Sequence, residues 1–212
     1  MSSLPPAAGP ASQEPTVYVI DDDESIRELL TWLMARNGIR CQSFPDARSF
    51  LKAYRTDAPG CLILDLRMPG MSGLDLQAML KAQGAMLPVI FLSGRADVSA
   101  AVQAVKGGAF DFIEKPFDYK RIVALVRECL ARDADSRAQR EVRKDVAARL
   151  AQLTPREREV MERVVAGKLN RVIAEELEIS IKTVEAHRAH IMEKLGVDSV
   201  ARLVQAVTSS RD

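Results

Sequence analysis

Short strand-like runs that alternate with helical patterns are the feature that most constrains the fold of this chain. Between residues 16 and 131, each run is followed by a stretch whose apolar residues recur at helical spacing. The runs are Val17–Ile20, Arg40–Ser43, Cys61–Leu64, Pro88–Ser93 and Phe110–Ile113. Five strands that each lead into a helix predict an α/β fold with a doubly wound, flavodoxin-like parallel sheet.

The last of these helices is predicted to be long. It opens at Asp118, and neither glycine nor proline interrupts the chain from Phe117 to Thr154. The stretch 132–143 within it is charged and rich in alanine, which is typical of an exposed linker. We expect this linker to be helical, with a flexible coil as the alternative.

A different pattern begins near residue 153. Thr154-Pro155-Arg156-Glu157 is a capping box with proline at the first helical position, which predicts a helix start. A short helix over Asn170–Leu177 and a helix over Ser180–Leu195 follow, separated by a tight turn at Glu178-Ile179, and Asp198 or Ser199 caps a fourth helix. Two helices joined by so short a turn predict a helix-turn-helix within a small all-α domain.

Length and charge fit this division. A chain of 212 residues has room for two small domains, and 30 basic against 29 acidic residues exclude a polybasic nucleic-acid coat but not a local DNA-binding face. Three dispersed cysteines suit the cytosol, and no apolar run is long enough to span a membrane. We expect a disordered tail over 1–15, an α/β domain over 16–131, a helical linker over 132–150 and a helical domain over 151–212.

Polar residues stand where four of the predicted strands end. Asp21, Asp22 and Asp23 follow the first strand, Asp65 the third, Ser93 ends the fourth, and Lys115 follows the fifth. Because the carboxyl ends of parallel strands share one edge of a sheet, these side chains should converge. Clustered carboxylates suit Mg²⁺, and a lysine and a hydroxyl beside it would hold phosphoryl oxygens. This pattern predicts phosphoryl transfer onto a carboxylate.

These residues resemble the receiver domain of two-component response regulators. The resemblance rests on Val17–Asp23, Leu64–Pro69, Leu92–Gly94 and Phe112–Phe117. It implies that Asp65 is the phosphoacceptor, and that Asp22 and Asp65 bind Mg²⁺ directly with the backbone carbonyl of Arg67, while Asp21 assists through water. It further implies that Ser93 and Lys115 contact the phosphoryl group and that Phe112 is a switch residue, although a plain core aromatic would also explain Phe112. Arg67 and Arg95 stand where the family tunes the phosphoryl lifetime. In that family the face of the Val98–Lys106 helix, the fifth strand and the last helix forms a symmetric dimer.

The C-terminal segment resembles the LuxR-type helix-turn-helix, and the whole arrangement resembles the NarL/FixJ class, most of all its FixJ branch. The resemblance rests on Leu153–Glu159, Asn170–Ala174, Ser180–His187 and Lys194-Leu195. It implies that Ser180–Leu195 is the recognition helix in the major groove. The candidate DNA-contacting residues are Asn170, Lys182, Thr183, Glu185, Ala186, His187, Arg188, Ala189 and Lys194. Of these, Glu185, Ala186 and Ala189 occupy base-facing positions, whereas Asn170, Lys182 and Arg188 are phosphate candidates.

The charge and the histidines of the C-terminal segment limit how it can bind DNA or a metal ion. Residues 151–212 carry ten basic and ten acidic side chains, so binding by a monomer should be modest and two half-sites should be needed. His187, His190 and Glu193 share one helix face, but with only two histidines in the chain they suit packing and phosphate contact better than a metal site.

We therefore expect a phosphorylation-gated transcription factor of the cytoplasm rather than a turnover enzyme. Its expected partners are a sensor histidine kinase, double-stranded promoter DNA, a second copy of the chain after phosphorylation, and RNA polymerase. A haloacid-dehalogenase-like phosphohydrolase would need an aspartate where Arg67 stands. The third alternative is an interaction module whose helical domain binds RNA polymerase or another protein instead of DNA.

Overall fold

The computed structural model describes residues 14–94 and 98–209 of the chain. Most of the predicted N-terminal tail, and the tuning position Arg95, lie outside these residues. The chain divides into two compact units, Met1–Ser136 and Arg137–Asp212. Within the described residues, no helix is both long and apolar enough to cross a membrane.

The first unit contains the predicted parallel sheet, which confirms the α/β fold class. Its strands are β1 (Thr16–Ile20), β2 (Cys41–Phe44), β3 (Gly60–Asp65), β4 (Val89–Ser93) and β5 (Asp111–Glu114). They pair in parallel in the order β2-β1-β3-β4-β5. This order places the carboxyl ends of β1, β3, β4 and β5 side by side at one edge.

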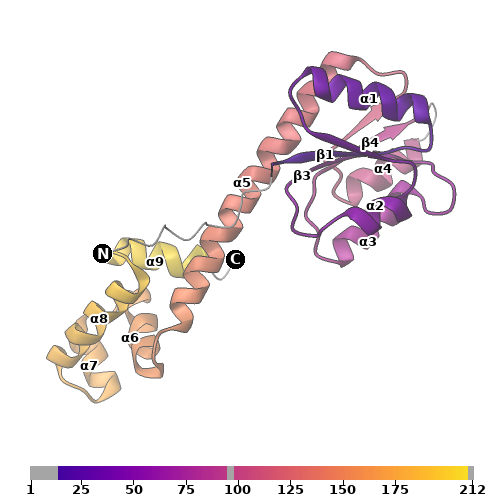
Figure 1. Cartoon of the computed structure of the whole chain (residues 1–212). Coiled ribbons are helices and arrows are strands. Elements are labelled where there is room, and N and C mark those ends of the chain that lie inside the picture. The colour runs from indigo at the N-terminus through magenta and orange to yellow at the C-terminus, as the bar shows by residue number, and fades with distance from the viewer. Residues whose placement is uncertain (1–13, 95–97, 210–212) are drawn as a thin grey trace, which may run out of the picture. The chain divides into compact units, whose positions relative to one another are not determined.

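Helices cover both faces of this sheet (Figure 1). They are α1 (Glu24–Arg36), α2 (Ala47–Ala53), α3 (Gly73–Ala82), α4 (Val98–Lys106) and α5 (Tyr119–Ala151). On one face, Leu30 of α1 and Ile122 of α5 pack against Ile63 of the sheet. On the other face, Phe50 of α2 and Leu76 of α3 join a second apolar cluster. Because both faces are covered, the strands β1, β3 and β4 are buried along their whole length.

Helix α5 is continuous over 33 residues, so the segment predicted as a helical or coiled linker is helical. One part of that prediction is wrong. Asp133, expected on an exposed stretch, is only 2% exposed. The reason is that its Oδ2 accepts a hydrogen bond of 2.9 Å from the backbone N–H of Gly60, at the start of β3. This contact lies within the first compact unit, Met1–Ser136, and the domain boundary near residue 131 stays a prediction.

The second unit holds the four predicted helices. They are α6 (Pro155–Val165), α7 (Asn170–Leu177), α8 (Ile181–Leu195) and α9 (Val200–Ser209). The predicted capping box at Thr154 and Glu157 is present, and Ser180 caps α8 by accepting from the N–H of Thr183. Glu178, in the left-handed conformation at φ 54°, makes the turn between α7 and α8. The domain is held by a small apolar core that includes Val160, Ile173, Val184, Ile191 and Leu203.

Candidate functional site

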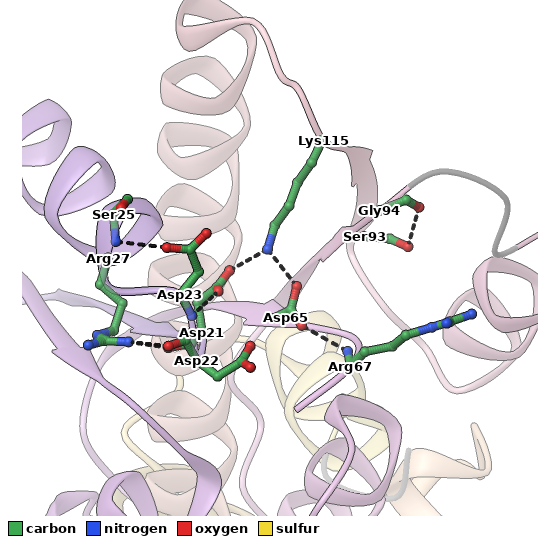
Figure 2. Close-up of polar contacts among 10 residues, drawn as sticks. All are labelled: Asp21, Asp22, Asp23, Ser25, Arg27, Asp65, Arg67, Ser93, Gly94 and Lys115. Carbon is green, nitrogen blue, oxygen red and sulfur yellow. Dashed lines mark hydrogen bonds and ion pairs between the residues drawn. The ribbon is translucent and has the colours of Figure 1, made fainter. Parts of the chain in front are cut away.

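The sheet edge brings together the four strand-end groups that the sequence predicts (Figure 2). Asp21 directly follows β1, Asp65 is the last residue of β3, Ser93 is the last residue of β4, and Lys115 directly follows β5. Since these four strands are consecutive neighbours in the sheet, their polar ends line one edge. Asp21, Asp65 and Ser93 are buried, and the side chain of Lys115 is about one-quarter exposed.

Lys115 bridges the two buried carboxylates. Its Nζ donates to Asp21 Oδ2 at 2.6 Å and to Asp65 Oδ1 at 2.7 Å. Figure 2 shows the ammonium reaching between the two aspartates from the loop that follows β5. One cation is thus shared by two carboxylates, and the exposed Asp22 adds a third acidic side chain beside them.

Burial and neighbouring charges have opposite effects on the pKa of Asp21 and on that of Lys115. Burial raises the pKa of Asp21, because it penalises the charged carboxylate, although the bond from Lys115 opposes this effect. Burial alone would lower the pKa of Lys115, but the bonds to Asp21 and Asp65 outweigh it and raise that pKa. The ammonium therefore stays charged at neutral pH.

The backbone holds the remaining carboxylate oxygens. The N–H of Asp23 donates to Asp21 Oδ1 at 3.0 Å, and the N–H of Arg67 donates to Asp65 Oδ2 at 2.9 Å. The start of α3 packs tightly behind Asp65, where a Cβ on Gly73 would lie 2.4 Å from the Asp65 carbonyl oxygen. Glycine at this position lets the helix approach the strand that carries Asp65.

Two residues near the site have roles that the sequence analysis missed. Asp23, which had no assigned role, caps α1 by accepting from the N–H of Ser25. Arg27 donates from Nη1 to the carbonyl oxygens of Asp21 at 2.8 Å and Asp22 at 2.9 Å, and so holds the acidic loop in place. The cap could have been found from an aspartate preceding a helical pattern. The Arg27 side chain reaches back to carbonyl oxygens of the preceding loop, and no spacing of residues in the sequence indicates such a contact.

Ser93 and Phe112 lie beside this cluster. The Ser93 hydroxyl donates to the carbonyl oxygen of Gly94 at 2.9 Å. Phe112, on the neighbouring strand β5, is half-buried and packs against the apolar cluster on the α2–α3 face. A half-buried aromatic beside a strand-end hydroxyl is compatible with either a switch residue or a core residue.

The donor set suits a hard divalent cation. Asp21, Asp22, Asp65 and the Arg67 carbonyl offer oxygen atoms only, as Mg²⁺ prefers. Over residues 14–94 and 98–209, however, no three His, Cys, Asp or Glu side chains are gathered in the arrangement of a metal site. In this structure, Lys115 is the cation that contacts both Asp21 and Asp65.

The second candidate surface is the N-terminal half of α8. The side chains of Lys182, Thr183, Glu185, Ala186 and Ala189 are exposed, whereas those of His187 and Arg188 are half-buried. Arg188 Nη1 donates to Asn170 Oδ1 at 2.8 Å, which ties α8 to the start of α7. The exposed set therefore includes the three residues predicted to face bases, and Lys182 among the predicted phosphate contacts.

Lys194, at the other end of α8, has a structural partner. Its Nζ donates to Glu157 Oε2 at 2.7 Å, and Glu157 is buried. The bonds from Lys194 and from the N–H of Thr154 lower the pKa of Glu157 to about 2. This ion pair favours a structural role for Lys194 over the predicted contact with DNA.

Comparison with known proteins decides the family. Residues 17–127 match the response regulator receiver domain, and residues 151–207 match the bacterial regulatory proteins of the luxR family. The chain belongs to the response regulators that carry a LuxR-type DNA-binding domain. It is 43% identical over 190 residues to the transcriptional regulatory protein FixJ of Bradyrhizobium diazoefficiens, spanning 89% of this chain and 92% of FixJ. It is 42% identical to the transcriptional regulatory protein TdiR of Thauera aromatica, over 91% of this chain and 85% of TdiR.

Solved structures agree with this assignment. The structure of the response regulator StyR matches with a TM-score of 0.83 and 39% identity, over 92% of this chain and 98% of StyR. Full-length FixJ from B. japonicum matches with a TM-score of 0.59 and 39% identity, over 94% of this chain and 98% of FixJ. The chain is thus a phosphorylation-dependent transcriptional regulator and not a classical enzyme. Its receiver domain implies a histidine kinase partner, and its LuxR-type domain implies binding to DNA.

Proposed function

We propose that Asp65 is the phosphoacceptor of this response regulator. The observation that carries the proposal is the Lys115 ammonium shared between Asp65 and Asp21, with Ser93 at the end of the adjacent strand. A shared ammonium can move from one carboxylate to an incoming phosphoryl oxygen without leaving the pocket. Asp65 keeps its orientation during this exchange, because the Arg67 N–H holds its other oxygen.

In the transfer step, an Asp65 oxygen attacks the phosphorus of a phosphohistidine on the kinase. The new O–P bond forms as the P–N bond breaks, and the histidine leaves as an imidazole that takes up a proton. Lys115 offsets the charge on the transferred group by exchanging its bond to Asp21 for one to a phosphoryl oxygen. Mg²⁺ held by Asp22, Asp65 and the Arg67 carbonyl, with Asp21 assisting through water, would supply further charge neutralisation. Autodephosphorylation uses the same residues with water as the attacking group.

The phosphoryl group then changes the neighbouring strand ends. The Ser93 hydroxyl gives up its bond to the Gly94 carbonyl and donates to the new phosphoryl oxygen. Phe112 of β5 moves into the space that Ser93 and its loop vacate at the end of β4. The face of α4, β5 and α5 then pairs with that of a second copy, where Val102 and Val105 of α4 are 48% and 63% exposed. Burial of these valines between two copies would favour the dimer.

In the phosphorylated dimer, two α8 helices read an inverted repeat in promoter DNA. Glu185, Ala186 and Ala189 face the base edges, and Asn170, Lys182 and Arg188 contact phosphates. The exposed Thr183 and the half-buried His187 lie in the same N-terminal half of α8 and support these contacts. We propose that the bound dimer acts on RNA polymerase in the cytoplasm. The receiver then comprises residues 16–136 and the DNA-binding domain residues 151–212, with α5 joining them.

The test uses the full chain with acetyl phosphate and Mg²⁺, and Asp65→Asn as the matched variant. We expect wild type to double its solution mass and to gain affinity for promoter fragments, whereas Asp65→Asn stays monomeric and binds weakly. Sedimentation and fluorescence anisotropy measure the two effects. A wild-type chain that dimerises but binds no DNA would instead favour the protein-interaction module. Equal behaviour of wild type and Asp65→Asn would contradict the proposal.

A further inference from the structure

The end of helix α5 is fastened to the end of the recognition helix. Arg149, in the last turns of α5, donates from Nη1 to the carbonyl oxygen of Leu195, the last residue of α8, at 3.0 Å. Its Nη2 forms an ion pair of 2.9 Å with Asp145, one turn earlier on α5. The guanidinium is therefore anchored on its own helix while it caps the negative end of the other.

Gly196, the residue after Leu195, leaves room for this contact. Gly196 ends α8 in the left-handed conformation, at φ 65°. A Cβ at this position would lie 2.3 Å from Arg149 Nη1. Glycine thus supplies the helix-ending conformation and also leaves the space that the guanidinium fills.

The capping is reciprocal, because cations from α6 and α8 donate to one carbonyl in the last turn of α5 and to one just after its end. Arg158 of α6 donates to the Leu150 carbonyl at 3.2 Å, and Lys194 of α8 lies 3.4 Å from the Gln152 carbonyl. Leu153 is buried in the core of the domain, and Leu150 packs against that core. Three cations and two apolar side chains therefore join the end of α5, and the residues just after it, to α6 and α8.

We propose that Arg149 is a positioning residue that fixes the direction in which the linker helix leaves the recognition helix, and that it thereby sets the spacing of DNA half-sites that the dimer accepts. This proposal rests on the dimeric function proposed above. A dimer reads two half-sites at a separation set by its geometry. If the joint between linker and α8 is rigid, the dimer binds well at one spacing. If the joint is loose, each domain reaches its half-site over a range of spacings, and the discrimination between spacings falls.

The experiment uses the full chain, phosphorylated with acetyl phosphate in the presence of Mg²⁺. The probes are a duplex selected by wild type from a random pool, a series in which base pairs are added or removed at its centre, and a duplex with a single half-site. The variants are Arg149→Ala, Arg149→Lys, and the control Arg143→Ala, which removes an exposed arginine from the same helix. Solution mass is measured for every sample.

For wild type and Arg143→Ala we expect affinity to fall on the order of tenfold between the best and the worst spacing. For Arg149→Ala we expect the single half-site to bind within about threefold of wild type, while the difference between spacings shrinks to about threefold or less. Arg149→Lys restores part of the discrimination, because an ammonium can still donate to the Leu195 carbonyl. Gly196→Ala, whose Cβ displaces the guanidinium, should reproduce the Arg149→Ala profile and so provides a second route to the same test.

Two outcomes overturn the proposal. One is an Arg149→Ala chain that folds, dimerises and keeps the wild-type spacing profile. The other is an Arg149→Ala chain that loses affinity equally for every probe, the single half-site included, since this would mean that Arg149 only supports the fold of α8. A wild-type chain that stays monomeric after phosphorylation would overturn the dimeric function itself, and the solution mass distinguishes that failure from the other two.

Discussion

Lys115 in the receiver and Lys194 in the DNA-binding domain each donate to a buried carboxylate, but their surroundings differ. Lys115 is shared by Asp21 and Asp65, so the pocket has more carboxylates than cations. Lys194 meets the single carboxylate of Glu157, whose Oε2 also accepts the N–H of Thr154 at 2.8 Å. The first arrangement keeps surplus negative charge at the sheet edge, whereas the second pairs one cation with one carboxylate.

This difference separates charges that serve function from charges that serve the fold. In the proposed mechanism, the surplus negative charge in the receiver attracts a divalent cation, and the Lys115 ammonium changes partners. In the DNA-binding domain, the pair of Lys194 and Glu157 joins α8 to α6. The DNA contacts that we propose come from exposed residues such as Lys182 and Glu185. Part of the basic complement of this domain is therefore paired within the fold, as in Arg163–Glu176 and Lys194–Glu157.

The largest effect that separates the two lysines is expected from Lys115→Met, which removes the cation shared by Asp21 and Asp65. We expect phosphorylation of Asp65 by acetyl phosphate to slow on the order of 10²-fold, because a donor to the developing phosphoryl charge is lost. The rate is measured by intact mass over time. A control, Lys120→Met, removes an exposed lysine of α5 and should leave the rate unchanged. Unchanged phosphorylation in Lys115→Met would mean that the ammonium only neutralises the resting pocket.

Removing the Glu157–Lys194 ion pair should lower the stability of the DNA-binding domain and should not affect phosphorylation of the receiver. We expect Glu157→Gln to destabilise the DNA-binding domain by about 2 kcal/mol, because a buried carboxylate that caps α6 and binds Lys194 is lost. Denaturation followed by circular dichroism measures the effect. Arg202→Ala, which removes the exposed pair with Asp198, should cost less than about 0.5 kcal/mol. Equal costs for the two variants would contradict a structural role for the Glu157–Lys194 pair.

Asp133 offers a matched test within the receiver. We expect Asp133→Ala to cost about 1.5 kcal/mol, since the buried N–H of Gly60 loses its acceptor. Asp135→Ala, two residues further along the same helix and exposed, should be neutral within about 0.5 kcal/mol. Fluorescence of Trp32, the single tryptophan, reports unfolding of the receiver. A neutral Asp133→Ala would place the end of the receiver nearer to residue 131.

The smallest expected effect is a difference in pH dependence between the two regions. The pKa of Glu157 is lowered from 4.5 to about 2, so its contribution to stability is complete above pH 4.5 and is lost as the pH falls from 4.5 towards 2. The pKa of Asp21 is raised above 3.8 by burial, so its contribution has the opposite sign and is lost as the pH rises through the raised pKa. We expect the acid-induced loss in the DNA-binding domain to diminish in Glu157→Gln. Identical acid profiles for wild type and Glu157→Gln would contradict this assignment.

The sequence predicts those parts of the molecule that follow from strand ends and helix caps. Asp21, Asp65, Ser93 and Lys115 converge because parallel strands end at one edge, and α6 and α8 begin at local capping signals. Contacts between distant residues carry no such signal. Asp133 bonds a residue 73 positions away, and Arg149 one 46 positions away, so neither contact leaves a periodic pattern. The position of Lys115 between two carboxylates also depends on side-chain packing that spacing alone does not reveal.

The most direct test of the central claim is the intact mass of wild type and Asp65→Asn after treatment with acetyl phosphate, with Mg²⁺ and with EDTA in place of Mg²⁺. We predict a single added phosphoryl group in wild type with Mg²⁺, and none in Asp65→Asn or in EDTA, while circular dichroism shows that both chains are folded. Phosphorylation of Asp65→Asn to the same extent, or a folded wild type that gains no mass, would contradict the assignment of Asp65 as the phosphoacceptor.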